Sequence, residues 1–134
     1  MHSKLNILIV DDDEGDRGQI RRALKESGLA FECVESVSVE QALALCELSA
    51  FDCAIVDYRL PGRDGLDGVA SLHRRLPYMS IIMATGQGDA NVATEAMKHG
   101  ASDYIAKAQV TGNSLRRIIE NALEKAAKKG GKLC

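Results

Sequence analysis

Strand-like and helix-like segments alternate along this chain, and this alternation is the feature that most restricts its fold. Five short runs rich in apolar or β-branched residues have the length of β-strands, namely Leu5–Val10, Phe31–Val37, Cys53–Val56, Ser80–Ala84 and Asp103–Ala106. A segment with helical spacing follows each run, and the connections are short. This pattern favours a parallel sheet with helices on both faces, and 134 residues suffice for one such domain.

The helical segments carry start and stop signals. The stretch from Ser38 to Gln41 fits a capping box, Gly28 is expected to end the first helix, and the third helix should stop before Pro77. The last helix has the clearest apolar stripe, formed by Leu115, Ile118, Ile119, Ala122, Leu123 and Ala126. We expect one domain over residues 1–127 and a linker or tag-like tail over residues 128–134.

Composition and charge argue against several broad classes of protein. The net charge of -2 and the pI near 5.9 provide no general positive field for nucleic acid. The apolar run Ile7–Val10 is far too short for a signal peptide or a membrane span. The four cysteines form no C-x-x-C pair, so neither a zinc site nor a redox motif is indicated. We therefore expect a cytoplasmic protein that binds neither nucleic acid nor membrane directly.

Polar side chains of different chemistry stand at the ends of four of the five expected strands. The first strand ends in Asp11-Asp12-Asp13, the third in Asp57, the fourth in Thr85 and the fifth in Lys107. Taken singly, each has an ordinary explanation as a turn, core or surface residue. Parallel strands, however, point their carboxyl ends to one edge of the sheet, where such folds bind ligands. The four endings together therefore predict one site.

The residue types at this edge are suited to phosphoryl chemistry. Converging carboxylates repel one another, which raises the pKa of at least one of them. A hard divalent cation, Mg²⁺ or Mn²⁺, would relieve the repulsion, and Lys107 could reach Asp57 from the other side. With an incoming phosphoryl group, Asp57 would act as nucleophile, the cation and Lys107 would offset charge, and the Thr85 hydroxyl would donate a hydrogen bond.

At these motifs the chain resembles the receiver domain of two-component response regulators, from about Lys4 to Lys125. The motifs that carry the resemblance are Ile9–Asp13, Val56–Gly65, Ala84–Gly86 and Gly100–Lys107. The resemblance implies an α/β fold with a flavodoxin-like, doubly wound five-stranded parallel sheet in the strand order 2-1-3-4-5. It also implies a phosphorelay switch that does not turn over other substrates. Asp57 would accept a phosphoryl group from a phosphohistidine of a sensor histidine kinase or phosphotransfer protein.

The resemblance assigns a metal site to the acidic residues. Asp12 and Asp57 would bind Mg²⁺ or Mn²⁺ directly, together with the backbone carbonyl of Arg59. Asp11 would act on the metal through water. Phosphoryl transfer to Asp57 would depend on this cation.

The resemblance also assigns residues that pass the signal on. Thr85 and Tyr104 match the family's switch pair, which alters the surface built from the fourth helix, the fifth strand and the fifth helix. A downstream protein would bind that surface. Arg59 and Gln87 occupy positions that tune how fast the phosphoryl group is lost.

One departure from the family pattern concerns the loop after the fifth strand. Receivers usually follow the lysine with a proline across a cis bond, whereas Ala108 follows Lys107 here. A non-proline cis bond costs about 2.5–4 kcal/mol, so we expect a trans bond, or a cis bond held by its surroundings. This departure leaves open a docking module of the same fold that works without phosphorylation.

Two further functions use related parts. A haloacid-dehalogenase-like phosphatase would place its nucleophile in a D-x-D-x-T/V motif on the first strand, where Gly15 stands at the Thr/Val position. A flavin or nucleotide binder would need glycines and hydroxyls in its first loop, where the acids from Asp11 to Glu14 would repel phosphate. A homodimer, the identity of the kinase and the output stay open.

Overall fold

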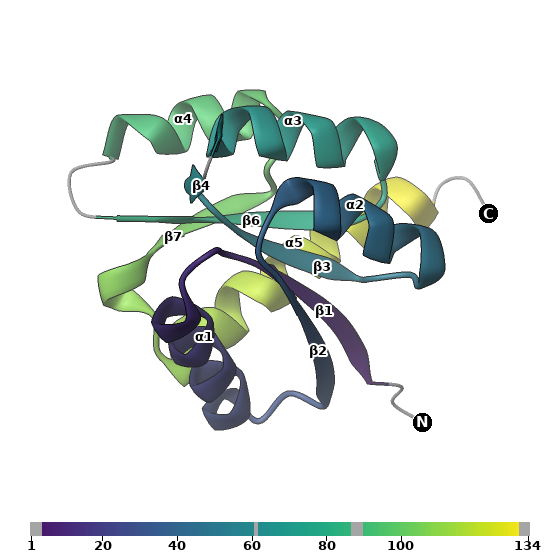
Figure 1. Ribbon diagram of the computed structural model, residues 1–134. Coiled ribbons are helices and arrows are strands. Elements are labelled where there is room, and N and C mark those ends of the chain that lie inside the picture. Colours follow the sequence, from purple (N-terminus) through teal and green to yellow (C-terminus); the bar gives the residue numbers. More distant parts are fainter. Residues whose placement is uncertain (1–3, 61, 87–89, 132–134) are drawn as a thin grey trace.

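The computed structural model describes residues 4–60, 62–86 and 90–131, and its main sheet has helices on both faces (Figure 1). The elements in chain order are β1 (Leu5–Val10), α1 (Glu14–Ser27), β2 (Phe31–Ser36), α2 (Val39–Leu48), β3 (Cys53–Asp57), β4 (Arg59–Leu60), β5 (Arg63–Asp64), α3 (Gly65–Arg75), β6 (Ser80–Thr85), α4 (Ala90–Lys98), β7 (Asp103–Ala106), the 3₁₀ helix η1 (Lys107–Gln109) and α5 (Gly112–Gly131). The five-stranded sheet is parallel throughout and has the order β2-β1-β3-β6-β7. Counted without the short strands β4 and β5, this is 2-1-3-4-5, and the predicted fold is confirmed.

The sheet separates two hydrophobic cores, because successive side chains of a strand point to opposite faces. Leu8 and Val10 of β1 pack in the core that α2, α3 and α4 cover. Ile7 and Ile9 of the same strand pack in the core under α1 and α5. Strands that are buried on both faces read as continuous apolar runs, which is why the central strands were recognisable in the sequence.

Asp57 and Thr85 lie inside the strands and not in the loops that follow them. The structure extends the third and fourth expected strands by one residue each, to Asp57 in β3 and Thr85 in β6. The main chain of β3 stays in register with β6, where Asp57 pairs with Ala84. The backbone pairing of the sheet therefore fixes the positions of both polar residues at the edge where the strands end.

The helix signals of the sequence correspond to observed caps. Gly28 ends α1 with φ 82°, a left-handed conformation that glycine adopts without steric cost. The Ser38 side chain accepts a hydrogen bond from the Gln41 backbone N–H, as expected for a capping box. The Gln41 side chain accepts a hydrogen bond from the backbone N–H of Val37, whereas a capping box would use the backbone N–H of Ser38.

Four further features differ from the expectations or extend them. Strand β2 ends at Ser36, one residue before the expected Val37. The antiparallel pair of β4 and β5, which follows Asp57 directly, was not foreseen. Helix α5 continues to Gly131, so it includes the first residues of the expected linker or tag-like tail over residues 128–134. The Lys107–Ala108 peptide bond is trans, which is the first of the two geometries expected for this loop.

Candidate functional site

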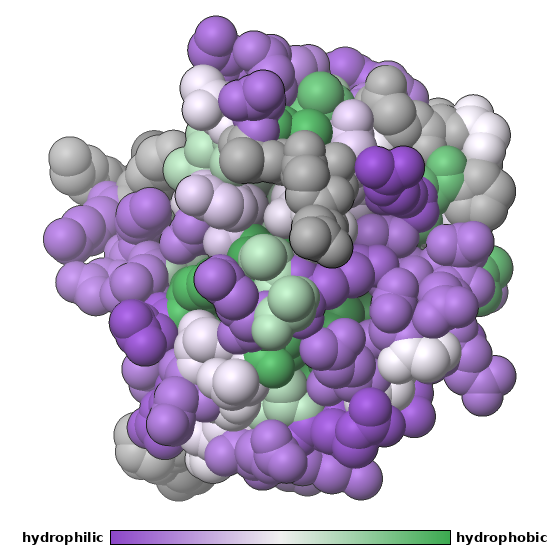
Figure 2. Space-filling model, turned by 90° about the vertical axis from the view of Figure 1, so that its left-hand side faces the viewer, coloured by the Kyte–Doolittle hydropathy of each residue, from purple (hydrophilic) through white to green (hydrophobic). Residues whose placement is uncertain are grey.

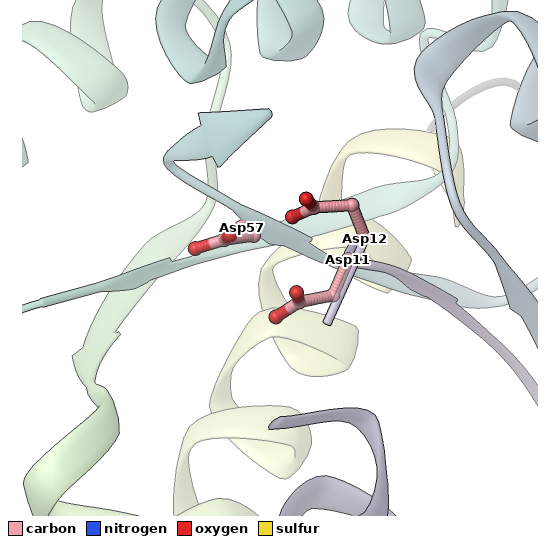
Figure 3. A group of neighbouring side chains, drawn as sticks. All are labelled: Asp11, Asp12 and Asp57. Carbon is pink, nitrogen blue, oxygen red and sulfur yellow. The ribbon is translucent and has the colours of Figure 1, made fainter. Parts of the chain in front are cut away.

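The carboxyl ends of β1 and β3 bring three aspartates together (Figure 3). Val10 pairs with Val56, so Asp11 and Asp57 follow on neighbouring strands at the same level of the sheet. Asp11, Asp12 and Asp57 each offer a carboxylate oxygen, and these oxygens lie within 4.8 Å of one another. The sequence predicted this convergence.

The three carboxylates differ in their surroundings. Asp11 is 1% exposed and Asp57 is 5% exposed, whereas Asp12 is exposed. Oδ1 of Asp11 accepts a hydrogen bond from the Asp13 backbone N–H at 2.9 Å. Oδ2 of Asp11 is buried and meets no well-aligned hydrogen-bond donor among the described residues, although the Lys107 ammonium lies 3.2 Å away as an ion-pair partner. A buried carboxylate oxygen that shares one ammonium with other carboxylates has the chemistry of a cation ligand.

Lys107 provides the positive charge of the site from the first residue of η1. Its Nζ lies 2.9 Å from Oδ1 of Asp57 and 3.2 Å from Oδ2 of Asp11. It also lies 2.6 Å from Oδ2 of Asp16, in the first turn of α1. Contact between Lys107 and Asp57 was predicted. The contact with Asp16 was not, since its position in the sequence indicated only an acid favoured by the helix dipole.

Burial controls the proton affinities of the two inner carboxylates. Desolvation raises the pKa of Asp57, and it outweighs the hydrogen bonds and charge of Lys107, which act to lower it. Desolvation likewise raises the pKa of Asp11, and the charge of Asp57 adds to the effect. Although burial disfavours the charged form of Lys107, the hydrogen bonds and charges of Asp16, Asp57 and Asp11 raise the pKa of Lys107. The site therefore holds more negative charge than one lysine neutralises.

Asp11→Asn is expected to stabilise the metal-free protein at pH 7, because burial disfavours the charged form of Asp11 and raises its pKa. The amide keeps the acceptor for Asp13 and removes a buried charge, while Lys107 keeps two carboxylates. Because the pKa of Asp11 is raised in the folded state, folded protein binds more protons than unfolded chain between the ordinary and the raised pKa values. The wild-type free energy of unfolding therefore falls as pH rises through that interval, and the advantage of the variant shrinks as pH falls through it.

Urea denaturation in the presence of a chelator, at pH values from 4 to about 7, measures this difference. A variant less stable than wild type at pH 7 would contradict the prediction. A difference in free energy that stays constant with pH would contradict it as well.

The remaining predicted site residues differ in their burial and in their contacts. The buried Thr85 hydroxyl donates a hydrogen bond to the Ile105 carbonyl at 3.4 Å, on the neighbouring strand β7. Tyr104 is 45% exposed, so its ring is not in the core. Arg59 is exposed, with its guanidinium 5.9 Å from the centre of the Tyr58 ring, and its backbone hydrogen-bonds to Asp57. Gln87 lies outside the described residues.

Gly65 is a residue of the site that sequence reasoning did not single out, although it ends one of the motifs. A Cβ added at Gly65 would lie 2.4 Å from Cα and 2.5 Å from the carbonyl oxygen of Tyr58. Tyr58 stands between Asp57 and Arg59, so the glycine lets α3 begin directly against the backbone of the site. A glycine at a close approach between backbones leaves no signature in hydrophobic periodicity.

Figure 2 shows the side of the molecule that lies at the left in Figure 1, where the strands end. Hydrophilic residues dominate this surface and surround a small group of apolar residues near its middle. None of the described helices combines the length and the apolar character that a membrane span requires.

Comparison with known proteins agrees with this geometry. Residues 7–124 match the family model of the response regulator receiver domain. The chain is 34% identical over 116 residues to the photosynthetic apparatus regulatory protein RegA of Rhodovulum sulfidophilum, covering 87% of this chain and 62% of that protein. It is 35% identical over 107 residues to the transcriptional regulatory protein FixJ of Azorhizobium caulinodans, covering 80% of this chain and 50% of that protein.

A solved structure has the same architecture. The response regulator receiver domain protein of Methanospirillum hungatei JF-1 superimposes with a TM-score of 0.81 and 29% identity, covering 95% of this chain and 99% of that one. The chain spans roughly half to three fifths of the length of the curated relatives named above. Receiver domains are regulatory modules of phosphorelay signalling, which bind Mg²⁺ at an acidic cluster and receive phosphate from sensor kinases. From its fold, its acidic site and the match over residues 7–124, this chain belongs to the response regulator receiver domain family.

Proposed function

We propose that this domain is a phosphorelay switch in which Asp57 is the phosphoacceptor. The proposal rests on the placement of Asp57. Asp57 is buried at the end of β3, and Lys107 Nζ lies 2.9 Å from one of its carboxylate oxygens. Carboxylate oxygens of Asp11 and Asp12 lie within 4.8 Å of one of its own. A carboxylate next to a fixed positive charge and a candidate cation site is suited to attack on phosphorus.

The transfer step involves one bond formed and one bond broken. A carboxylate oxygen of Asp57 attacks the phosphorus of a phosphohistidine, and the phosphorus–nitrogen bond breaks with its electron pair moving to the imidazole. The product is an acyl phosphate on Asp57 and a free histidine. The Lys107 ammonium offsets charge on the phosphoryl oxygens, since it already lies within reach of Asp57.

The residues present fit a divalent cation. Asp11, Asp12 and Asp57 supply hard oxygen ligands within 4.8 Å of one another, and the one ammonium near them among the described residues, that of Lys107, is shared among several carboxylates. Asp12, Asp57 and the Arg59 carbonyl would hold Mg²⁺ or Mn²⁺, and Asp11 would act through water. The ion, when bound, supplies positive charge for the phosphoryl oxygens.

The signal would leave through Thr85 and Tyr104. In the structure the Thr85 hydroxyl donates a hydrogen bond to the carbonyl of Ile105, and Tyr104 is exposed on β7. We expect phosphorylation to draw the Thr85 hydroxyl to the phosphoryl group and the Tyr104 ring inward. That change would alter the surface of α4, β7 and α5, where exposed Met97 offers an apolar contact to a downstream protein.

The remaining expectations rest on the family and on the site. The mostly hydrophilic rim with an apolar centre (Figure 2) fits a transient contact with a sensor kinase or phosphotransfer protein. We propose that Arg59 and Gln87 tune the lifetime of the phosphoryl group. We also propose that the domain works in the cytoplasm and has no turnover on other substrates. The paired Asp57 and Lys107 favour this function over phosphorylation-independent docking.

Asp12→Asn is expected to weaken Mg²⁺ binding by at least 10–100-fold, the loss typical when only an outer-shell partner of a metal is removed. Asp12 is exposed and offers an oxygen to the cluster, so its replacement removes a ligand without opening a cavity. Isothermal titration of the full chain with MgCl₂ measures the affinity. Incubation with a small phosphodonor measures phosphoryl uptake by intact mass.

Asp13→Asn is the matched control. It removes the same charge from the neighbouring residue, and asparagine retains the helix cap that Asp13 provides for α1. The control should bind Mg²⁺ within a few-fold of wild type. Equal losses in both variants would mean that Asp12 acts through general charge and is not a ligand. Wild-type protein that takes up no phosphoryl group with Mg²⁺ would overturn the proposed function.

A further inference from the structure

Two side chains of helix α1 contact Lys107, one at its side-chain ammonium and one at its backbone carbonyl. Oδ2 of Asp16 lies 2.6 Å from the Lys107 ammonium, which is shorter than the contacts of that ammonium with Asp57 and Asp11. The Gln19 side-chain Nε2 donates a hydrogen bond to the Lys107 backbone carbonyl at 2.9 Å. Asp16 and Gln19 are three residues apart and thus lie on the same face of α1.

The two contacts have different consequences. The hydrogen bond from Gln19 anchors the main chain at the start of η1, the segment in which Ala108 replaces the usual proline. Asp16 takes one of the three hydrogen-bond donors of the ammonium. A phosphoryl group on Asp57 would bring new anionic oxygens to the same donors. The lysine then has more carboxylate and phosphoryl partners than it can satisfy.

Exposure identifies the partner that gives way. The side chain of Asp16 is 36% exposed, whereas those of Asp11 and Asp57 are 1% and 6% exposed. A carboxylate released toward water recovers its hydration, while a buried one left without a cation does not. Asp16 can therefore release the lysine at the lowest cost.

We infer that Asp16 is a positioning residue that acts through Lys107. It shares the ammonium in the unphosphorylated domain and yields it to the phosphoryl group, while Gln19 keeps the lysine backbone in place. This inference rests on the proposed phosphoacceptor function of Asp57. On this inference, α1 and the aspartates at the strand ends together determine how readily the Lys107 ammonium can bind the phosphoryl group.

The affinity of the full chain for beryllofluoride, a phosphoryl mimic, at saturating Mg²⁺ tests the inference. Asp16→Asn is expected to raise this affinity about two- to fivefold, the range typical of a partly exposed ion pair. Gln19→Leu is expected to lower it, because the lysine backbone loses its anchor. Glu14→Gln removes the same charge as the first variant from an exposed position in the same turn and should leave the affinity unchanged.

A second measurement needs neither metal nor phosphoryl mimic. In ¹H–¹⁵N correlation spectra of the metal-free protein, the Lys107 ammonium protons should exchange with water faster in Asp16→Asn than in wild type. Asp16→Glu should restore slow exchange. Thermal unfolding of each variant verifies that it is folded.

The outcomes separate the two proposals. Wild-type protein that fails to bind beryllofluoride with Mg²⁺ would overturn the phosphoacceptor function and this inference together. Wild-type binding with an unchanged or weaker affinity in Asp16→Asn would overturn only the role of Asp16. Equal gains in Asp16→Asn and Glu14→Gln would reduce the effect to general charge and also overturn it.

Discussion

Asp57→Asn is expected to take up no phosphoryl group under conditions in which the wild-type protein is modified once. The amide is nearly isosteric, so the end of β3 keeps its shape, but a neutral amide oxygen is a poor nucleophile and a weak partner for Lys107. Intact-mass spectrometry after incubation with a small phosphodonor and Mg²⁺ measures the uptake. The expected effect is a complete loss.

Asp52→Asn is the matched control for this experiment. Asp52 is exposed just before the other end of β3, where its side chain accepts a hydrogen bond from the backbone N–H of Asn6. This variant should be phosphorylated like wild type. A phosphoryl group found on Asp57→Asn at wild-type stoichiometry would show that another residue is the acceptor, and peptide mapping would identify it.

Gly65→Ala is expected to destabilise the protein by about 1–3 kcal/mol, the usual result of forcing extra volume into a packed position, or by more. The added methyl group would meet the backbone of Tyr58 at 2.4 Å, and backbone atoms cannot rotate away as a side chain can. Since Tyr58 lies between Asp57 and Arg59, relief of the clash would shift the acceptor and the Arg59 carbonyl. Urea denaturation measures the stability, and titration with MgCl₂ measures the site.

Gly18→Ala is the control for the glycine effect. Gly18 is buried in α1, and a methyl group there would meet only the ends of the Arg21 and Arg22 side chains at 3.4 Å. Alanine is the better helix former by about 1 kcal/mol, so this variant should be as stable as wild type or more stable. A Gly65→Ala protein with wild-type stability and wild-type Mg²⁺ affinity would contradict the close approach between α3 and Tyr58.

The fold was predictable because its signals are local. Strands buried on both faces need nearly continuous apolar residues, and β1 was expected with its observed bounds. The short edge strand β7 was also expected with its observed bounds. The convergence of Asp11, Asp12 and Asp57 followed from the parallel arrangement, since parallel strands end at one edge. The end of the last helix was harder to locate. Lys128 to Gly131 read as a tail because glycine is a poor helix former, yet α5 includes them.

The contact of Asp16 with Lys107 was not predictable from either residue. An acid in the first turn of a helix has the same sequence pattern whether it serves only the helix dipole or pairs with a lysine 91 positions away. The hydrogen bond from Gln19 to the Lys107 carbonyl has no pattern at all. Both depend on how far α1 lies from η1, which is set by packing across the α1 and α5 face of the sheet.

By itself, the sequence of this protein determined the order of its elements, the parallel sheet and the set of residues that meet at the sheet edge, because periodicity and strand direction are properties of short segments. Only the tertiary structure decided which carboxylates share the Lys107 ammonium, where Thr85 and Tyr104 rest, and why position 65 holds a glycine. Those features depend on distances of a few ångströms between elements far apart in the chain, and such distances arise only when the two cores have packed.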